Sequence, residues 1–152
     1  MTDDDDLLNH LKGMWDKTDP VPPDLADRII FALQLENLEY ELLRLVHTAA
    51  PVGTRGASTV STVSFGSDQL TVMLRLPGVA GPSRRLDGWL APGAALRVEL
   101  RSGGGRQETV ASAEGRFALT DVPPGLFQLI VHPTAGAAVT LSRPLVTPAI
   151  EL

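Results

Sequence analysis

The sequence of 152 residues predicts an all-β sandwich of about seven to eight antiparallel strands, preceded by an acidic arm of two helices. Short segments with alternating apolar residues recur between residues 58 and 152, separated by glycine, proline and serine. Residues 1–50 show helical spacing instead. Cysteine is absent and 43% of the residues are hydrophobic, so a packed core rather than a disulfide framework must hold the domain.

The arm is expected to begin with a helix over residues 4–17. Four consecutive acids, Asp3 to Asp6, place negative charge in its first turn, where the backbone dipole favours it. One apolar stripe at helical spacing contains Leu7, Leu11, Met14 and Thr18, and Leu8 and Trp15 widen it. This helix therefore has one apolar and one polar face.

A second helix is predicted over residues 23–47, after a break that contains Pro20 and Pro22. Its apolar residues fall into two stripes. One stripe contains Leu25, Ile29, Leu33, Tyr40 and Leu43, and the other contains Phe31, Leu35, Leu38, Leu42 and Leu45 at alternating spacings of four and three. A helix with two apolar stripes needs two neighbours.

These stripes predict a surface that binds another protein. The first helix is one neighbour, and the other is the β-domain of the same chain, a second copy or a different protein, because an exposed apolar strip is a liability on a monomer. We expect the partner-binding residues to be Trp15, Phe31, Leu35, Leu38, Leu42 and Leu45.

The predicted domain organisation is an arm over residues 1–50, a linker over 51–57 rich in small residues and proline, and a β-domain over 58–152. Strands are expected near residues 58–65, 70–76, 85–90, 96–101, 107–111, 115–119, 126–131, 138–142 and 145–152. The turn Pro123-Pro124-Gly125 predicts a hairpin-like corner between two of them.

Four segments carry a family resemblance: Leu86-Asp87-Gly88-Trp89-Leu90, Leu96-Arg97-Val98-Glu99-Leu100, Gly115-Arg116-Phe117-Ala118-Leu119 and Val122-Pro123-Pro124-Gly125-Leu126-Phe127-Gln128-Leu129. With them the β-domain resembles carboxypeptidase regulatory-like domains, which share a transthyretin-like (prealbumin-like) sandwich. Phe127-Gln128 departs from the Tyr-x-Leu strand frequent in that family. The resemblance implies a non-catalytic accessory or binding role. The whole chain also resembles small actinobacterial proteins with such an arm and sandwich, which implies no activity.

Charge is divided unevenly along the chain. Residues 1–48 hold 11 acids and 4 bases, whereas residues 49–152 hold 7 acids and 9 bases. The acidic front lacks the basic region of a signal peptide, and no apolar run reaches membrane-spanning length, so we expect a soluble, cytoplasmic protein. The arginines at 84, 85, 97, 101, 106 and 116 are candidates for a basic patch, but the acidic arm and the scarcity of aromatics argue against direct nucleic-acid binding.

Catalytic and metal-binding patterns are weak. The three histidines, His10, His47 and His132, lie far apart in the sequence and have no ligand spacing between them, and no nucleophile motif accompanies them. We therefore expect no catalytic residue, no metal and no cofactor. Asp87 and Glu99 are expected to form cross-strand ion pairs with nearby arginines. Trp89 is expected in the core.

The sequence thus predicts a non-enzymatic cytoplasmic interaction or adaptor protein. Its N-terminal helices would bind a partner protein, for example a regulatory or transcription-related one, or a second copy of the chain. One alternative is that the β-sandwich binds a small molecule, a carbohydrate or a peptide. Another is an enzyme, for which His132 is the residue to mutate.

Overall fold

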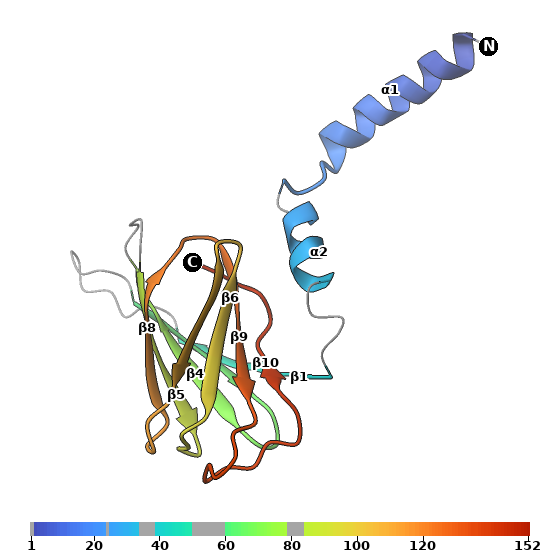
Figure 1. Cartoon of the computed structure of the whole chain (residues 1–152). Helices are drawn as coiled ribbons and strands as arrows, with labels where there is room; N and C mark the ends of the chain where they lie inside the picture. Colours follow the sequence, from blue (N-terminus) through green and yellow to red (C-terminus); the bar gives the residue numbers. More distant parts are fainter. Residues whose placement is uncertain (1, 24, 34–38, 50–59, 79–83) are drawn as a thin grey trace. The chain divides into compact units, whose positions relative to one another are not determined.

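The chain forms two compact units, Met1–Glu36 and Asn37–Leu152. The computed structural model describes all residues except 1, 24, 34–38, 50–59 and 79–83 (Figure 1). The first unit contains the helices α1 (Thr2–Thr18) and α2 (Leu25–Leu33). Neither is long and apolar enough to cross a bilayer.

The second unit is predominantly β and has two sheets, which agrees with the predicted all-β class and is compatible with a sandwich. Sheet A has the order β1-β10-β9-β6-β7, with β11 also paired to β9, and sheet B has the order β2-β3-β4-β5-β8. The strands are β1 (Glu41–Leu42), β2 (Arg44–Ala49), β3 (Ser61–Gly66), β4 (Thr71–Leu76), β5 (Arg84–Ala91), β6 (Arg97–Ser102), β7 (Gly105–Val110), β8 (Arg116–Val122), β9 (Leu126–His132), β10 (Leu145–Val146) and β11 (Ile150–Glu151). Every pair is antiparallel except β1 with β10.

The predicted helix over residues 23–47 is wrong from residue 41 onward. Helix α2 is described over Leu25–Leu33, residues 34–38 lie outside the described part, and β1 and β2 occupy most of residues 41–49. The segment from residue 42 to 46, Leu-Leu-Arg-Leu-Val, is apolar at all but one position, so it is compatible with both the helical and the strand period. Pairing with existing strands decides the outcome, because β1 pairs with β10 and β2 pairs with β3.

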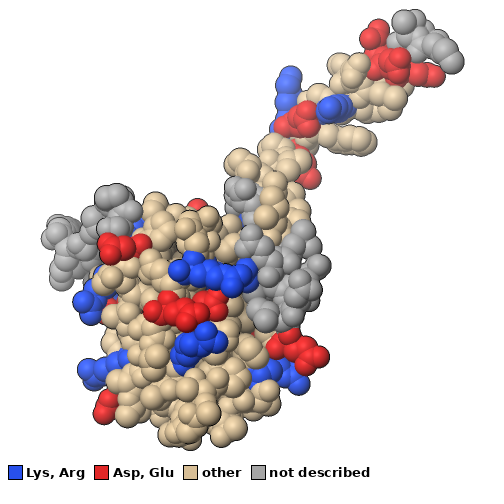
Figure 2. All heavy atoms as spheres, viewed as in Figure 1, with Lys and Arg blue, Asp and Glu red and all other residues tan. Residues whose placement is uncertain are grey.

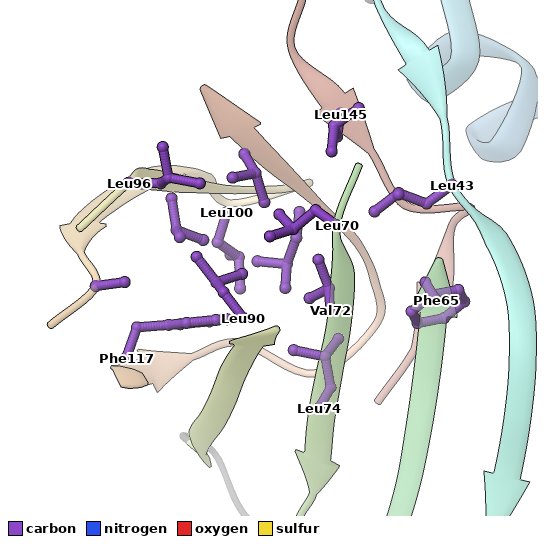
Figure 3. Close-up of a cluster of buried hydrophobic side chains, with 14 of the residues drawn as sticks. Leu43, Phe65, Leu70, Val72, Leu74, Leu90, Leu96, Leu100, Phe117 and Leu145 are labelled. Atoms are coloured by element: carbon purple, nitrogen blue, oxygen red, sulfur yellow. The ribbon is translucent and has the colours of Figure 1, made fainter. Parts of the chain in front are cut away.

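This segment crosses from one sheet to the other at Leu43. Its backbone N–H donates to the carbonyl oxygen of Val146 at 2.8 Å, and its side chain is fully buried in the core. Figure 3 shows Leu43 entering the cluster of buried side chains from this crossing strand. One continuous piece of chain therefore belongs to both sheets, and the β unit begins before residue 50.

The core lies between the sheets and follows the predicted alternation. Val72 and Leu74 of β4, Leu100 of β6 and Leu129 of β9 are completely buried in one cluster. Figure 3 shows Val72, Leu74 and Leu100 in this cluster. Since successive residues of a strand point to opposite faces, each buried residue places its neighbours on an outer face. At about 25 cal/mol per Å² of buried apolar area, this interior supplies the main stabilisation of the unit.

The Pro123-Pro124-Gly125 turn is a corner between the sheets rather than a hairpin. Strand β8 belongs to sheet B and β9 to sheet A, so the chain changes sheet there. Gly125 has a φ of 113°, and its backbone exchanges two hydrogen bonds with Leu152. The predicted strand at 138–142 is absent, because that described segment is a loop, whereas the predicted strand at 145–152 is present as β10 and β11.

We expect Gly115→Ala to destabilise the sandwich strongly. Gly115 has a φ of 84°, and a Cβ there would overlap the carbonyl oxygen of Leu90. Gly136 is the matched control, because it has a φ of 78° and a Cβ added to it would meet no atom within 4 Å. Gly136→Ala should cost about 1–2 kcal/mol for backbone strain alone, and Gly115→Ala about 1–3 kcal/mol more for the steric overlap. Urea unfolding of both variants measures the difference, and equal losses would contradict the steric argument.

Candidate functional site

The outer face of sheet A carries a cluster of charged side chains. Val98 and Leu100 of β6 point into the core, so the residues between and beside them lie on the opposite face. Across the strand registers this face forms three rows: His132, Arg97 and Val110; Ile130, Glu99 and Glu108; and Gln128, Arg101 and Arg106. The two glutamates therefore lie between rows that contain arginine.

Glu99 is the centre of this cluster. Its Oε2 lies 2.8 Å from Nε2 of His132, and its Oε1 lies 3.7 Å from Nε of Arg106. Beside it, Nη1 of Arg97 donates to Oε1 of Glu108 at 3.0 Å. Figure 2 shows acidic side chains lying between two groups of basic ones on the face of the sandwich in view, an order that matches the rows of β6 and β7.

Burial shapes the electrostatics of the cluster. Burial lowers the pKa of Arg101 below its ordinary value; the neighbouring Arg106 acts in the same direction and Glu99 opposes it. Because the glutamates alternate with the arginines, the cluster is largely neutralised within itself. We therefore assign it a structural role in holding β6, β7 and β9 together.

The expected cross-strand pairing is confirmed for Glu99 and is wrong for Asp87. Asp87 accepts a hydrogen bond at 2.9 Å from Nε of Arg85, two residues away on the same strand. His132 lies at the end of β9, where its Nε2 is 2.8 Å from Oε2 of Glu99 and its backbone carbonyl accepts a hydrogen bond from the hydroxyl of Thr134. In the part of the chain that the structure describes, no three acidic or histidine side chains gather as metal ligands.

A hollow of about 370 Å³ lies on the outer face of sheet B. We call it the Trp89 hollow, lined chiefly by Arg75, Arg85, Asp87, Trp89, Arg116 and Ala118. Trp89 lies opposite Arg116, and Asp87 lies opposite Ala118. The hollow exists because Ala118 offers only a methyl group where its neighbours carry long side chains.

The expected core position of Trp89 is wrong. Leu86 and Leu90 of β5 point into the core, so Trp89 lies on the outer face, where it is half-buried. Three arginines and one aspartate give the hollow a formal charge of +2. An aromatic ring among guanidinium groups is a recognition surface for an anion that also has an apolar part.

The six arginines considered for a basic patch do not form one, because five of them are divided between the two outer faces and Arg84 lies opposite Val122 at the start of β5. Arg97, Arg101 and Arg106 lie on the outer face of sheet A, whereas Arg85 and Arg116 lie on that of sheet B. In the first group, Arg97 is paired with Glu108, and Nε of Arg106 lies 3.7 Å from Oε1 of Glu99. Arg75 and Arg116 of the Trp89 hollow form no ion pair among the described residues.

A turn next to the hollow holds a perturbed carboxyl. The backbone N–H of Glu114 and then the hydroxyl of Ser112 lower the pKa of Glu114, burial opposes them slightly, and Arg116 adds a smaller lowering. Ser112 also accepts a hydrogen bond at 3.2 Å from the N–H of Arg116. This turn therefore fixes the backbone at the start of β8, where Arg116 enters the hollow.

The arm presents the other candidate surface. On α1 the side chains of Leu8 and Trp15 are 63% and 67% exposed, and those of Leu7 and Met14 are also exposed. Phe31 on α2 is buried. Gly13 lies in the second half of this 17-residue helix, and an isolated helix of that length is marginal in water.

The predicted seam of the second helix is not formed as one stripe. Leu42 lies in β1 and Leu45 in β2, so the two exposed side chains belong to different sheets. Leu35 and Leu38 lie outside the described residues. The partner-binding role of Trp15 and Phe31 stays a prediction. Sequence reasoning missed the Trp89 hollow, although the alternation of β5 and β8 already placed Trp89 and Arg116 on polar faces.

No protein-family model matches the chain, no curated protein matches its sequence, and no solved structure matches its fold.

We expect Glu99→Gln to cost about 1–3 kcal/mol of stability, because it removes a buried charge from two partners. Glu108→Gln is the control, since the same change is made on the neighbouring strand. The side chain of Glu99 is 8% exposed and that of Glu108 is 53% exposed. An exposed pair is worth about 0.2–1 kcal/mol, so Glu108→Gln should change urea unfolding little. Equal losses would show that burial of Glu99 is irrelevant.

We expect Ser112→Ala to raise the pKa of Glu114 toward its ordinary value, because the hydroxyl favours the ionised carboxylate. A pKa that is lower in the folded than in the unfolded state contributes stability above the unfolded value, and that contribution is lost as the pH falls through the folded value. The variant should therefore lose less stability than the wild type on acidification over that range. NMR titration of the Glu114 side chain checks the shift, and an unchanged pKa would contradict the assignment.

Proposed function

We propose that this chain is a cytoplasmic, non-enzymatic interaction protein in which α1 binds a partner protein and the β-sandwich is the scaffold. The observation that carries the proposal is the exposed apolar face of α1, with Leu8 and Trp15 the most exposed of its large apolar side chains. We further propose that the sandwich belongs to the carboxypeptidase regulatory-like, transthyretin-like class, on the strength of its Gly-Arg-Phe strand and its Val-Pro-Pro-Gly corner.

The chemistry of α1 supports a protein partner. Leu8, Leu11 and Trp15 recur at spacings of three and four, which places them on one face of the helix. Amphipathic helices bind by laying such a face into an apolar groove. Tryptophan is enriched among the residues that dominate binding energy, because it buries a large area at low entropic cost.

The weak intrinsic stability of α1 also supports binding. The helix contains Gly13, and both its length and this glycine make it marginal by itself. A partner that buries the apolar face would stabilise the helical conformation. The proposed partner is a regulatory or transcription-related protein.

A second candidate function is ligand binding by the sandwich. The Trp89 hollow favours it, because the hollow combines a half-buried aromatic ring with an excess of positive charge. Both features suit an acidic peptide better than a carbohydrate, which would need more aromatic surface.

The proposal predicts that Trp15→Glu and Leu8→Glu each reduce capture of a partner protein from cell lysate by at least about tenfold, since a charge would enter the apolar interface. Asn9→Glu is the matched control, because it adds the same charge to α1 outside the face that Leu8, Leu11 and Trp15 share. Affinity capture with the full chain, quantified by mass spectrometry, gives the measurement. Equal capture by the wild type and by Trp15→Glu would refute the role of α1.

A further inference from the structure

We infer that the Trp89 hollow of one copy binds the first turns of α1 of a second copy. The inference rests on the proposed function of α1 as a binding helix, and it names the partner and its surface. Three features of the chain point to it: the charge of the hollow, the position of the acids in the sequence, and the spacing of the groups that would meet.

The Trp89 hollow combines guanidinium groups, which can bind an anion, with an aromatic ring, which can contact an apolar group. Arg85 is already paired with Asp87 at 2.9 Å. Arg75 lies opposite Asp87 on β4, and Arg116 lies opposite Trp89 on β8. Arg75 and Arg116 are exposed, so their guanidinium groups can bind a carboxylate from outside. Met73 lies on the other side of Trp89 and extends the apolar part of the face.

The chain supplies the complementary charge. Residues 1–36 hold nine acids and three bases, whereas residues 37–152 hold nine acids and ten bases. Asp4, Asp5 and Asp6 of α1 are exposed and form no ion pair among the described residues. An acidic arm and a mildly basic sandwich attract each other when two copies meet, and charge steering of this kind raises association rates.

The spacing on α1 fits the spacing on sheet B. Asp4 and Leu8 are four residues apart on one helix face, which separates their Cβ atoms by about 5–6 Å. Arg116 and Trp89 lie directly opposite each other on antiparallel strands, which separates their Cβ atoms by about 4.5–5.5 Å. Asp4 can therefore meet Arg116 while Leu8 lies on the ring of Trp89.

The charges of the chain and of the hollow favour a protein ligand over a nucleic acid. A nucleic acid would bring a polyanionic backbone toward a chain whose net charge is −5. Within the described residues, the hollow offers two arginines without an ion-pair partner rather than an extended basic track, so it suits a short run of carboxylates. A short oligonucleotide serves as the competing ligand in the test.

The test is a charge exchange in the full chain, read by sedimentation equilibrium. The wild type should form a dimer that weakens as the salt concentration rises. Arg116→Glu and Asp4→Arg should each weaken the dimer by at least about tenfold, and the double variant should recover to within about threefold, because it restores the opposite charges. All substituted positions are exposed, and circular dichroism verifies that each variant is folded.

Two control variants carry the same changes elsewhere. Arg143→Glu alters an exposed arginine in the loop before β10, and Asp16→Arg alters an exposed acid near the other end of α1. Both should leave the dimer unchanged. Any of four results would overturn the inference. The wild type could be monomeric at every concentration, the single variants could have no effect, or the double variant could fail to recover. The fourth result is that the oligonucleotide binds more tightly than a second copy. Capture of a partner through Trp15 would survive any of these results, so the two proposals fail separately.

Discussion

The whole β unit depends on burying one face of each sheet against the other. Leu74 of β4 and Leu129 of β9 have no solvent-exposed surface, and the alternation of every strand follows from this requirement. The same requirement leaves each sheet with one outer face. Because the interior is filled with buried apolar side chains, we expect recognition by the sandwich to use these outer faces, its loops or its edges.

The two outer faces differ in how their charges are used. On sheet A, Glu99 is buried and is shared between His132 and Arg106, so its charge is used within the fold. On sheet B, Trp89 is half-buried and Arg116 has no carboxylate within ion-pair distance among the described residues. A face whose charges are paired holds strands together, whereas a face with unpaired charge and an aromatic ring is available to a ligand.

The crossing strand explains the largest difference between the predicted and the observed arm. Residues 42–46 are almost uniformly apolar, so their pattern satisfies a helix and a strand equally well. Leu43 is drawn into the core because the sandwich would otherwise lose a buried side chain at the junction of its two sheets. What remains of the arm is α1 and the short α2, and the exposed apolar face that supports the interaction proposal lies on α1.

The sequence by itself determined the two-sheet sandwich, most of its strands and the first helix, because these depend on local alternation and on turn residues such as Pro124 and Gly125. The tertiary structure alone decided that residues 41–49 are strands, that the Pro-Pro-Gly corner joins two sheets, and that Trp89 faces outward beside Arg116. Those features depend on pairing between segments far apart in the chain. Local periodicity contains no information about which strand will be the neighbour.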